Sequence, residues 1–162
     1  MIYKELDIDI DSSHLIQVFE DNKKDKLSQY KIKNTQGEIL GTRDYYEMYF
    51  TFKEGKELFY EQFPYECRGY QYVYMPPQYE MVIHKDISYL TYRIGCKLLG
   101  SAEILFYDDD HETIIDSYDY AKPVLTNVQV PHNVKNNDDY RLTFFVNFTE
   151  EHYESYKTLL WT

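Results

Sequence analysis

Three short stretches in the C-terminal half of the chain decide the fold: Met81–Asp86 (MVIHKD), Val130–Val134 (VPHNV) and Tyr140–Phe148 (YRLTFFVNF). Each has the apolar, β-branched or aromatic content that is typical of a strand. Successive side chains of a strand point to opposite faces, so His84 and Asp86 would share one face. The three stretches therefore predict strands that carry ionisable side chains among apolar ones.

The segments on either side of these stretches also predict strands. Gly100 separates two of them, which we expect to be successive antiparallel strands, and a polar loop over residues 133–139 would join the last pair. Helices are expected over residues 13–29 and after Thr149, and residues 44–63 are ambiguous between strand and helix. Few helices among many short strands predict a mainly β fold, a sandwich or jelly roll. The further strand candidates are residues 5–10, 71–75, 89–99, 101–107, 113–115 and 123–130.

Length and charge limit the function classes. The 162 residues fit a single domain over residues 1–162, with no internal repeat or linker. The formal net charge of −11, without a run of Lys or Arg, argues against nucleic acid and anionic membranes as partners. No signal peptide or membrane-spanning apolar run is present, so we expect a cytoplasmic protein. Cys67 and Cys96 are far apart without metal-type spacing and predict two buried thiols.

Two histidines and one aspartate are the candidate metal ligands. Two imidazoles and one carboxylate that converge on one point bind ferrous iron and leave coordination positions open. His84 and Asp86 supply two of these groups, and His132 follows Pro131 at the end of an apolar strand. A single His-x-Asp motif is weak evidence, because it often occurs by chance.

Arg141 strengthens the prediction. It lies on the strand after His132 and shares a face with Thr143, Phe145 and Asn147. An arginine on the inward face of an aromatic-rich barrel needs an anionic partner, because an unpaired buried charge is costly. A dicarboxylate cosubstrate can supply that partner through a bidentate contact.

The order of these features resembles the iron(II)- and 2-oxoglutarate-dependent oxygenases of the double-stranded β-helix fold. The chain looks most like the short prolyl- or aspartyl-hydroxylase-like members found in phages and bacteria. The resemblance covers roughly residues 72–148, close to half the chain. The paired-arginine pattern of the nucleic-acid-repair members is missing, since only Arg141 follows His132. The matching features are Pro76-Pro77, His84-Lys85-Asp86, Arg93, Pro131-His132 and Arg141.

The resemblance implies a jelly-roll or cupin-like fold with a few flanking helices, and it implies roles for individual residues. His84, Asp86 and His132 would bind Fe(II), and Arg141 would hold the distal carboxylate of the cosubstrate 2-oxoglutarate. Arg93 would assist there, with a cross-strand salt bridge as the alternative. Apart from the resemblance, Tyr72 is a candidate to hydrogen-bond the cosubstrate, with a core or rim position as the alternative in a chain so rich in tyrosine.

The implied activity is that of a dioxygenase that consumes O2, with ascorbate as a reductant. Hydroxylation of a protein or peptide side chain is the first expectation, and of a small molecule the second. The alternative is a catalytically inactive jelly-roll binding or structural module. The sequence gives no prediction of the oligomeric state.

Overall fold

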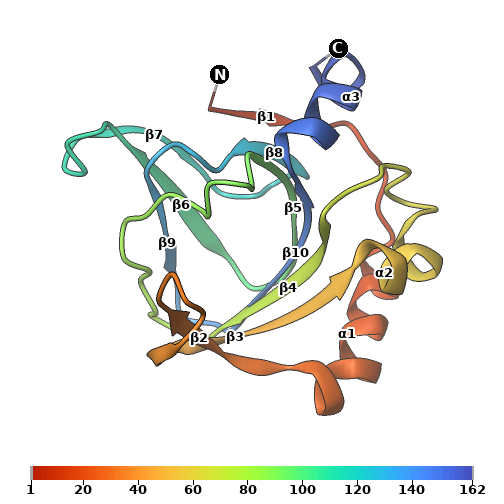
Figure 1. Cartoon of the computed structure of the whole chain (residues 1–162), viewed down its shortest axis with the longest axis horizontal. Coiled ribbons are helices and arrows are strands. Elements are labelled where there is room, and N and C mark those ends of the chain that lie inside the picture. The colour runs from red at the N-terminus through yellow and green to blue at the C-terminus, as the bar shows by residue number, and fades with distance from the viewer. Residues whose placement is uncertain (1, 162) are drawn as a thin grey trace.

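The computed structural model describes the backbone of residues 2–161 and all of their side chains except those of residues 102, 159 and 161. The fold is mainly β, as predicted, and its strands are antiparallel. Figure 1 shows the strands curled around one another like a barrel, with helices on the outside. In chain order the elements are β1 (Tyr3–Glu5), α1 (Ser12–Lys26), β2 (Ser28–Lys33), β3 (Ile39–Thr51), α2 (Phe52–Phe59), β4 (Gly69–Met75), β5 (Tyr92–Leu99), β6 (Ala102–Tyr107), β7 (Ile114–Tyr118), β8 (Val124–Asn127), β9 (His132–Asn136), β10 (Arg141–Phe148) and α3 (Glu150–Trp161).

Two sheets face each other. The larger has the order β1-β8-β5-β10-β4-β3-β2, and the smaller has the order β7-β6-β9. Residues 80–84 extend the smaller sheet through single bridges from Glu80 to Lys135 and from His84 to His132. From β4 to β10 the chain passes repeatedly between the two sheets. This is the double-stranded β-helix, a jelly roll, that the resemblance implies.

Strand β10 forms the centre of the larger sheet, between β4 and β5. Its side chains alternate as predicted. Leu142, Phe144, Val146 and Phe148 join the aromatic core on the helix side. Arg141, Phe145 and Asn147 point to the other side and line the cavity between the sheets. Every residue of β10 is buried, so one strand contributes both to the core and to the cavity.

Helices α1 and α2 cover the outer face of the larger sheet beside β3 and β4 (Figure 1). Asp11 caps α1 by accepting a hydrogen bond from the His14 backbone N–H at 3.1 Å. Thr51 and Glu54 form a reciprocal capping box at the start of α2. Phe59 of α2 then packs against Phe144, with ring centroids 4.9 Å apart. The helices thus seal the aromatic face and leave the opposite face of the sheet to the cavity.

Several local predictions were wrong. Only β1 is a strand near residues 5–10, and residues 81–86 form a single isolated bridge, at His84, rather than a regular strand. β5 and β6 do not pair, because Gly100, at φ +75°, turns the chain from the larger sheet into the smaller one. β8 and β10 do not pair either, and the polar loop expected at 133–139 contains most of β9. Among the described residues, no helix combines the length and apolar character needed to cross a bilayer.

Candidate metal and cosubstrate site

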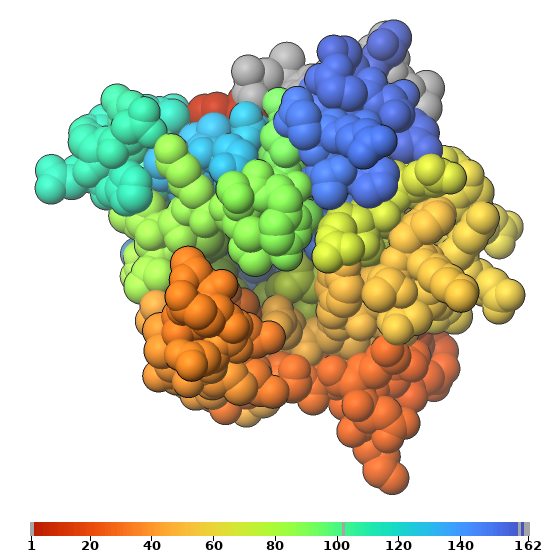
Figure 2. All heavy atoms as spheres, in the orientation of Figure 1, coloured from red at the N-terminus to blue at the C-terminus, as the bar shows by residue number. Residues whose placement is uncertain are grey.

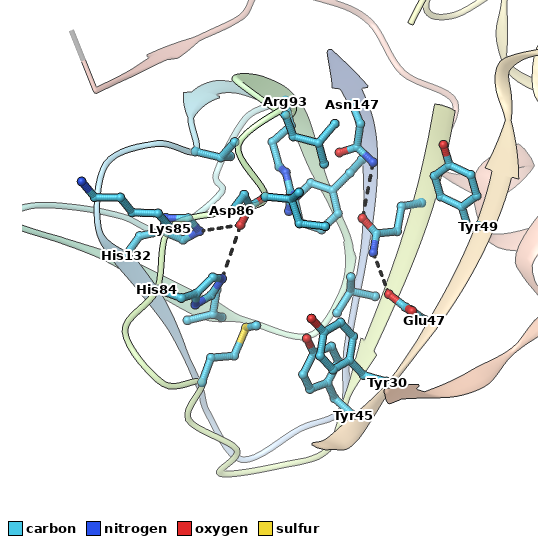
Figure 3. A pocket seen from close by; sticks show the side chains of 18 of the residues that line it. Tyr30, Tyr45, Glu47, Tyr49, His84, Lys85, Asp86, Arg93, His132 and Asn147 are labelled. Atoms are coloured by element: carbon cyan, nitrogen blue, oxygen red, sulfur yellow. Dashed lines mark hydrogen bonds and ion pairs between the residues drawn. The ribbon is translucent and has the colours of Figure 1, made fainter. Parts of the chain in front are cut away.

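The structure brings His84, Asp86 and His132 together on the smaller-sheet side of the cavity (Figure 3). One potential ligand atom from each residue lies within 4.8 Å of the others. Asp86 Oδ1 is 3.4 Å from His84 Nε2 and 3.5 Å from His132 Nε2. His84 and Asp86 point to the same side, as the two-residue period predicts. Two imidazole nitrogens and one carboxylate oxygen are the donor set that suits divalent iron.

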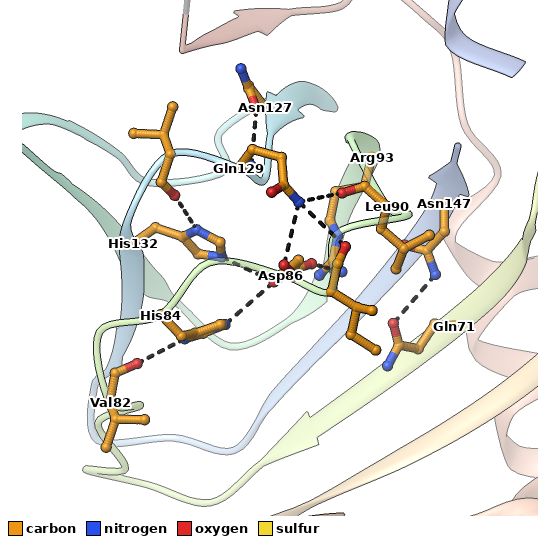
Figure 4. Close-up of polar contacts among 12 residues, drawn as sticks. Gln71, Val82, His84, Asp86, Leu90, Arg93, Asn127, Gln129, His132 and Asn147 are labelled. Carbon is orange, nitrogen blue, oxygen red and sulfur yellow. Dashed lines mark hydrogen bonds and ion pairs between the residues drawn. The ribbon is translucent and has the colours of Figure 1, made fainter. Parts of the chain in front are cut away.

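Both histidines present Nε2 for the same reason. His84 Nδ1 donates a hydrogen bond to the Val82 carbonyl at 2.8 Å, and His132 Nδ1 donates to the Val130 carbonyl at 2.8 Å (Figure 4). A carbonyl only accepts, so Nδ1 carries the proton and Nε2 keeps its lone pair. The bridge between the two backbones, with N···O distances of 2.9 Å in both directions, holds the rings side by side. The imidazoles are therefore preset as metal ligands.

Asp86 is held as a carboxylate. Burial raises its pKa, but the positive charge of Arg93 outweighs that effect and holds the pKa of Asp86 well below its usual range. Arg93 Nη2 pairs with Asp86 Oδ2, while Oδ1 faces the two imidazoles. The Arg93 guanidinium also lies 4.6 Å from the centre of the Phe145 ring. Arg93 therefore lies in the cavity, but its ion pair is with a candidate metal ligand.

Gln129 fixes the backbone around Asp86. Its Nε2 donates to the carbonyls of Leu90, Asp86 and Ile87 at 2.6, 3.3 and 3.3 Å (Figure 4). The Asp86 N–H donates to the Val128 carbonyl at 3.0 Å. Residues 86–90 have no regular strand pairing, so these bonds determine where the carboxylate lies.

Arg141 is 1% exposed, and among the described residues its Nε and Nη2 have no hydrogen-bond partner. It lines the same cavity as the metal-ligand candidates. Burial lowers the pKa of Arg141, yet a guanidinium remains charged in proteins. Unpaired donors on a buried cation are costly. A carboxylate bound in the cavity would satisfy them.

Tyr120 supports Arg141. The centre of its ring lies 4.9 Å from the guanidinium carbon. The residue is in the left-handed region at φ +59°, which is rare for a bulky side chain. Gly95 leaves room for the ring, because a Cβ there would lie 2.7 Å from Tyr120 Cε1. The strained backbone of Tyr120 and the lack of a side chain at Gly95 together place the Tyr120 ring beside Arg141.

The cavity has a volume of about 970 Å³, at the upper end of the range for small-molecule sites. Figure 2 shows the surface hollowed between the β2–β3 hairpin and residues 80–90. Across the cavity from the metal-ligand candidates lie Tyr30, Tyr45 and Glu47 (Figure 3). The cavity is therefore large enough for a cosubstrate and a second molecule.

The prediction that Tyr72 contacts a cosubstrate was wrong. Tyr72 is fully buried on the helix side of β4, and its hydroxyl donates to the Leu15 carbonyl at 2.7 Å. Sequence reasoning missed Tyr120, Gly95 and Gln129. The only sequence signal for them was a glycine inside a strand pattern, which indicates a close approach of another group.

Comparison with solved structures identifies proteins of similar architecture. A prolyl-4-hydroxylase from Pseudomonas putida aligns with a TM-score of 0.60 at 12% identity, over 91% of this chain and 92% of that chain. An oxidoreductase of the 2OG-Fe(II) oxygenase family from Burkholderia pseudomallei aligns with a TM-score of 0.52 at 11% identity, over 85% and 79%. The chain has the fold of these oxygenases. No protein-family model and no curated protein sequence matches it.

Proposed function

We propose that this protein is an iron(II)- and 2-oxoglutarate-dependent dioxygenase that hydroxylates a protein or peptide side chain or a small molecule. One observation carries the proposal. A fully buried arginine with unpartnered donors lines the same cavity as a two-histidine, one-carboxylate set. The histidines and aspartate alone would fit many metal proteins. The buried arginine also needs an anionic partner, and a keto-dicarboxylate cosubstrate would supply one.

His84, Asp86 and His132 would hold the iron, and their chemistry fits it. Both Nε2 atoms are free to bind because the Nδ1 protons are used by backbone carbonyls. Asp86 supplies the anionic ligand through Oδ1, and Arg93 holds Oδ2. When bound, iron would supply the activation of dioxygen.

Arg141 would orient the cosubstrate by a charge-assisted contact to its distal carboxylate. In the reaction, 2-oxoglutarate loses carbon dioxide and becomes succinate as it takes up one atom of dioxygen. The other atom is inserted into a C–H bond of the substrate. The burial of Arg141 keeps water from competing for its donors and strengthens the contact.

Turnover of the cosubstrate tests the proposal. Aerobic protein with ferrous iron and ascorbate should convert 2-oxoglutarate to succinate slowly even without added substrate. Asp86→Ala should sharply lower this turnover because it removes the anionic ligand. Asp25→Ala, which removes an exposed carboxylate on α1, is the matched control and should keep it.

Metal binding separates the proposal from the alternative of an inactive binding module. His84→Ala and His132→Ala should each abolish binding of one Fe(II), Mn(II) or Co(II) per chain with the fold intact. Absence of both succinate and the visible iron–2-oxoglutarate absorption band would favour the binding module. Full metal occupancy in the double variant would refute the metal site itself.

A further inference from the structure

The residues that line the cavity carry more positive than negative charge, whereas the whole chain is strongly negative. Six of the 17 Lys and Arg residues line it, but only two of the 28 Asp and Glu residues do. Every charged residue of the chain belongs to the described part, so both counts refer to the same set. Two of the cations, Arg93 and Arg141, belong to the buried site. A surplus of positive charge therefore remains at the mouth of the cavity in a protein of net charge −11.

Three of the cations at the mouth are Lys31, Lys33 and Arg68. All three are exposed, and among the described residues none has an ion-pair partner. They come from β2 and from the segment before β4, so they lie around the opening rather than along one strand. The fourth, Lys85, pairs with Asp109 at 3.3 Å. We call Lys31, Lys33 and Arg68 the basic rim.

Aromatic rings line the same cavity as the basic rim. Tyr30 and Tyr45 are stacked, with ring centroids 4.9 Å apart and planes 18° from parallel. Both face the cavity across from the metal-ligand candidates (Figure 3). Tyr89 lies under the Arg68 guanidinium at 5.6 Å. Planar rings combined with cations form a surface on which flat, anionic molecules bind.

The inner wall presents hydrogen-bond acceptors. Glu47 Oε2 accepts from Gln71 Nε2 at 3.0 Å, and Gln71 Oε1 accepts from Asn147 Nδ2 at 3.4 Å (Figure 3). A carboxylate only accepts, so its charge fixes the orientation of both amides. Asn147 Oδ1 is left without a partner among the described residues, on a side chain that is 2% exposed. This wall therefore needs a ligand that donates hydrogen bonds.

We propose that the substrate is a small nucleotide-like molecule, with a flat, donor-bearing ring against Tyr30, Glu47 and Asn147 and a phosphate at the basic rim. This inference rests on the proposed function and deepens it. The amino groups of a nucleobase can donate to the wall acceptors, and lysine and arginine bind phosphate oxygens. An acidic peptide would bring carboxylates toward Glu47. A long nucleic acid would be repelled by the net charge of −11.

Calorimetric titration of protein loaded with Mn(II) and 2-oxoglutarate under argon tests the inference. The probes are the four nucleoside monophosphates, the matching nucleosides, a single-stranded oligonucleotide and an Asp/Glu-rich peptide. At least one monophosphate should bind about tenfold more tightly than its nucleoside. Lys33→Glu should weaken that binding about tenfold or more, whereas Lys24→Glu, the same change on exposed α1, should not. Glu47→Gln should reduce the preference for AMP and CMP over UMP.

Equal binding of nucleotide and nucleoside, tighter binding of the peptide or oligonucleotide, or no binding of any probe would overturn the inference. The titration needs no turnover, so its outcome is independent of the succinate assay. If the protein forms succinate but binds no nucleotide, the proposed function stands and the nucleotide-like substrate is refuted. A protein that binds a monophosphate but never forms succinate would keep the nucleotide-binding site but refute the proposed function, and with it the role of the nucleotide as a substrate.

Discussion

Replacement of Arg141 by methionine should change stability and ligand affinity in opposite directions. Arg141 is 1% exposed, and its Nε and Nη2 atoms have no hydrogen-bond partner among the described residues. Exchange of a buried ionic group for an apolar one of similar size often stabilises a fold by about 1–4 kcal/mol. Loss of the contact to the Tyr120 ring, about 0.5–2 kcal/mol, offsets part of that gain. The ligand-free variant should therefore be as stable as the native protein or more stable.

The same variant should bind 2-oxoglutarate poorly. Truncation of one partner of a buried charge pair costs about 2–5 kcal/mol, which corresponds to a loss of about 30-fold to 5000-fold in affinity. Metal affinity should stay unchanged, because among the described residues Asp86 pairs with Arg93, His84 and His132 and not with Arg141. Calorimetry of Mn(II)-loaded protein under argon gives the affinity, and thermal unfolding of the ligand-free protein gives the stability.

Lys135→Met is the matched control, since Lys135 is exposed on β9 and the charge change is the same. Its cosubstrate affinity should remain that of the native protein. Unchanged affinity in Arg141→Met would refute the reasoning and make Arg93 the first candidate for the anchor. A large loss of stability together with unchanged affinity would show that Arg141 serves the fold alone.

Three further predictions concern the surroundings of the site. Gln129→Leu removes the donor that holds the loop at Asp86, so metal affinity, measured by chelator competition, should fall about 10-fold to 100-fold. Gly95→Ala would place a Cβ 2.7 Å from Tyr120 Cε1, so the free energy of unfolding should fall by about 1–3 kcal/mol and cosubstrate affinity should also fall. Burial raises the pKa of Cys96 to about 12, so at pH 8 only about one thiol in ten thousand is ionised. A disulfide reagent should therefore fail to label Cys96 in the native protein and should label it after unfolding.

Each of these predictions has a control. Gln129→Glu keeps the length of the side chain but loses the amide donor, and recovery of metal affinity in this variant would contradict the role of the amide. Gly41→Ala meets only one atom, at 4.0 Å, and should be neutral. Rapid labelling of Cys96 in the native protein would show that the larger sheet opens far more readily than its burial implies.

The sequence predicted those parts of the site that depend on local geometry. Alternation along a strand was enough to put His84 beside Asp86 and to put Arg141 on the opposite face from Phe144. The same rule failed for Tyr72, because both faces of β4 are largely buried. Alternation tells which residues share a face but not which face is the cavity. Gln71 and Val73 are the residues of β4 that line it.

The remaining parts depend on long-range packing. The role of Tyr120 follows from its left-handed backbone, from the position of Arg141 on β10, and from the missing side chain at Gly95. No local pattern encodes that combination. The basic rim was hidden for a similar reason. Lys31 and Lys33 are only two residues apart, but Arg68 is remote from them in the sequence, so no run of Lys and Arg revealed the rim, and the net charge of −11 gave no indication of it.

The burial of β10 on both faces has a consequence for how this protein can change under selection. Almost every substitution on that strand alters either the aromatic core or the cavity, so the sequence of β10 has little freedom to change. β2 lies at the edge of the same sheet, and its lysines at positions 31 and 33 are exposed. New side chains can appear there with little loss of stability. Substitutions on the edge strand β2 can therefore change the preference for one substrate over another, while the residues of the central strand β10 stay the same.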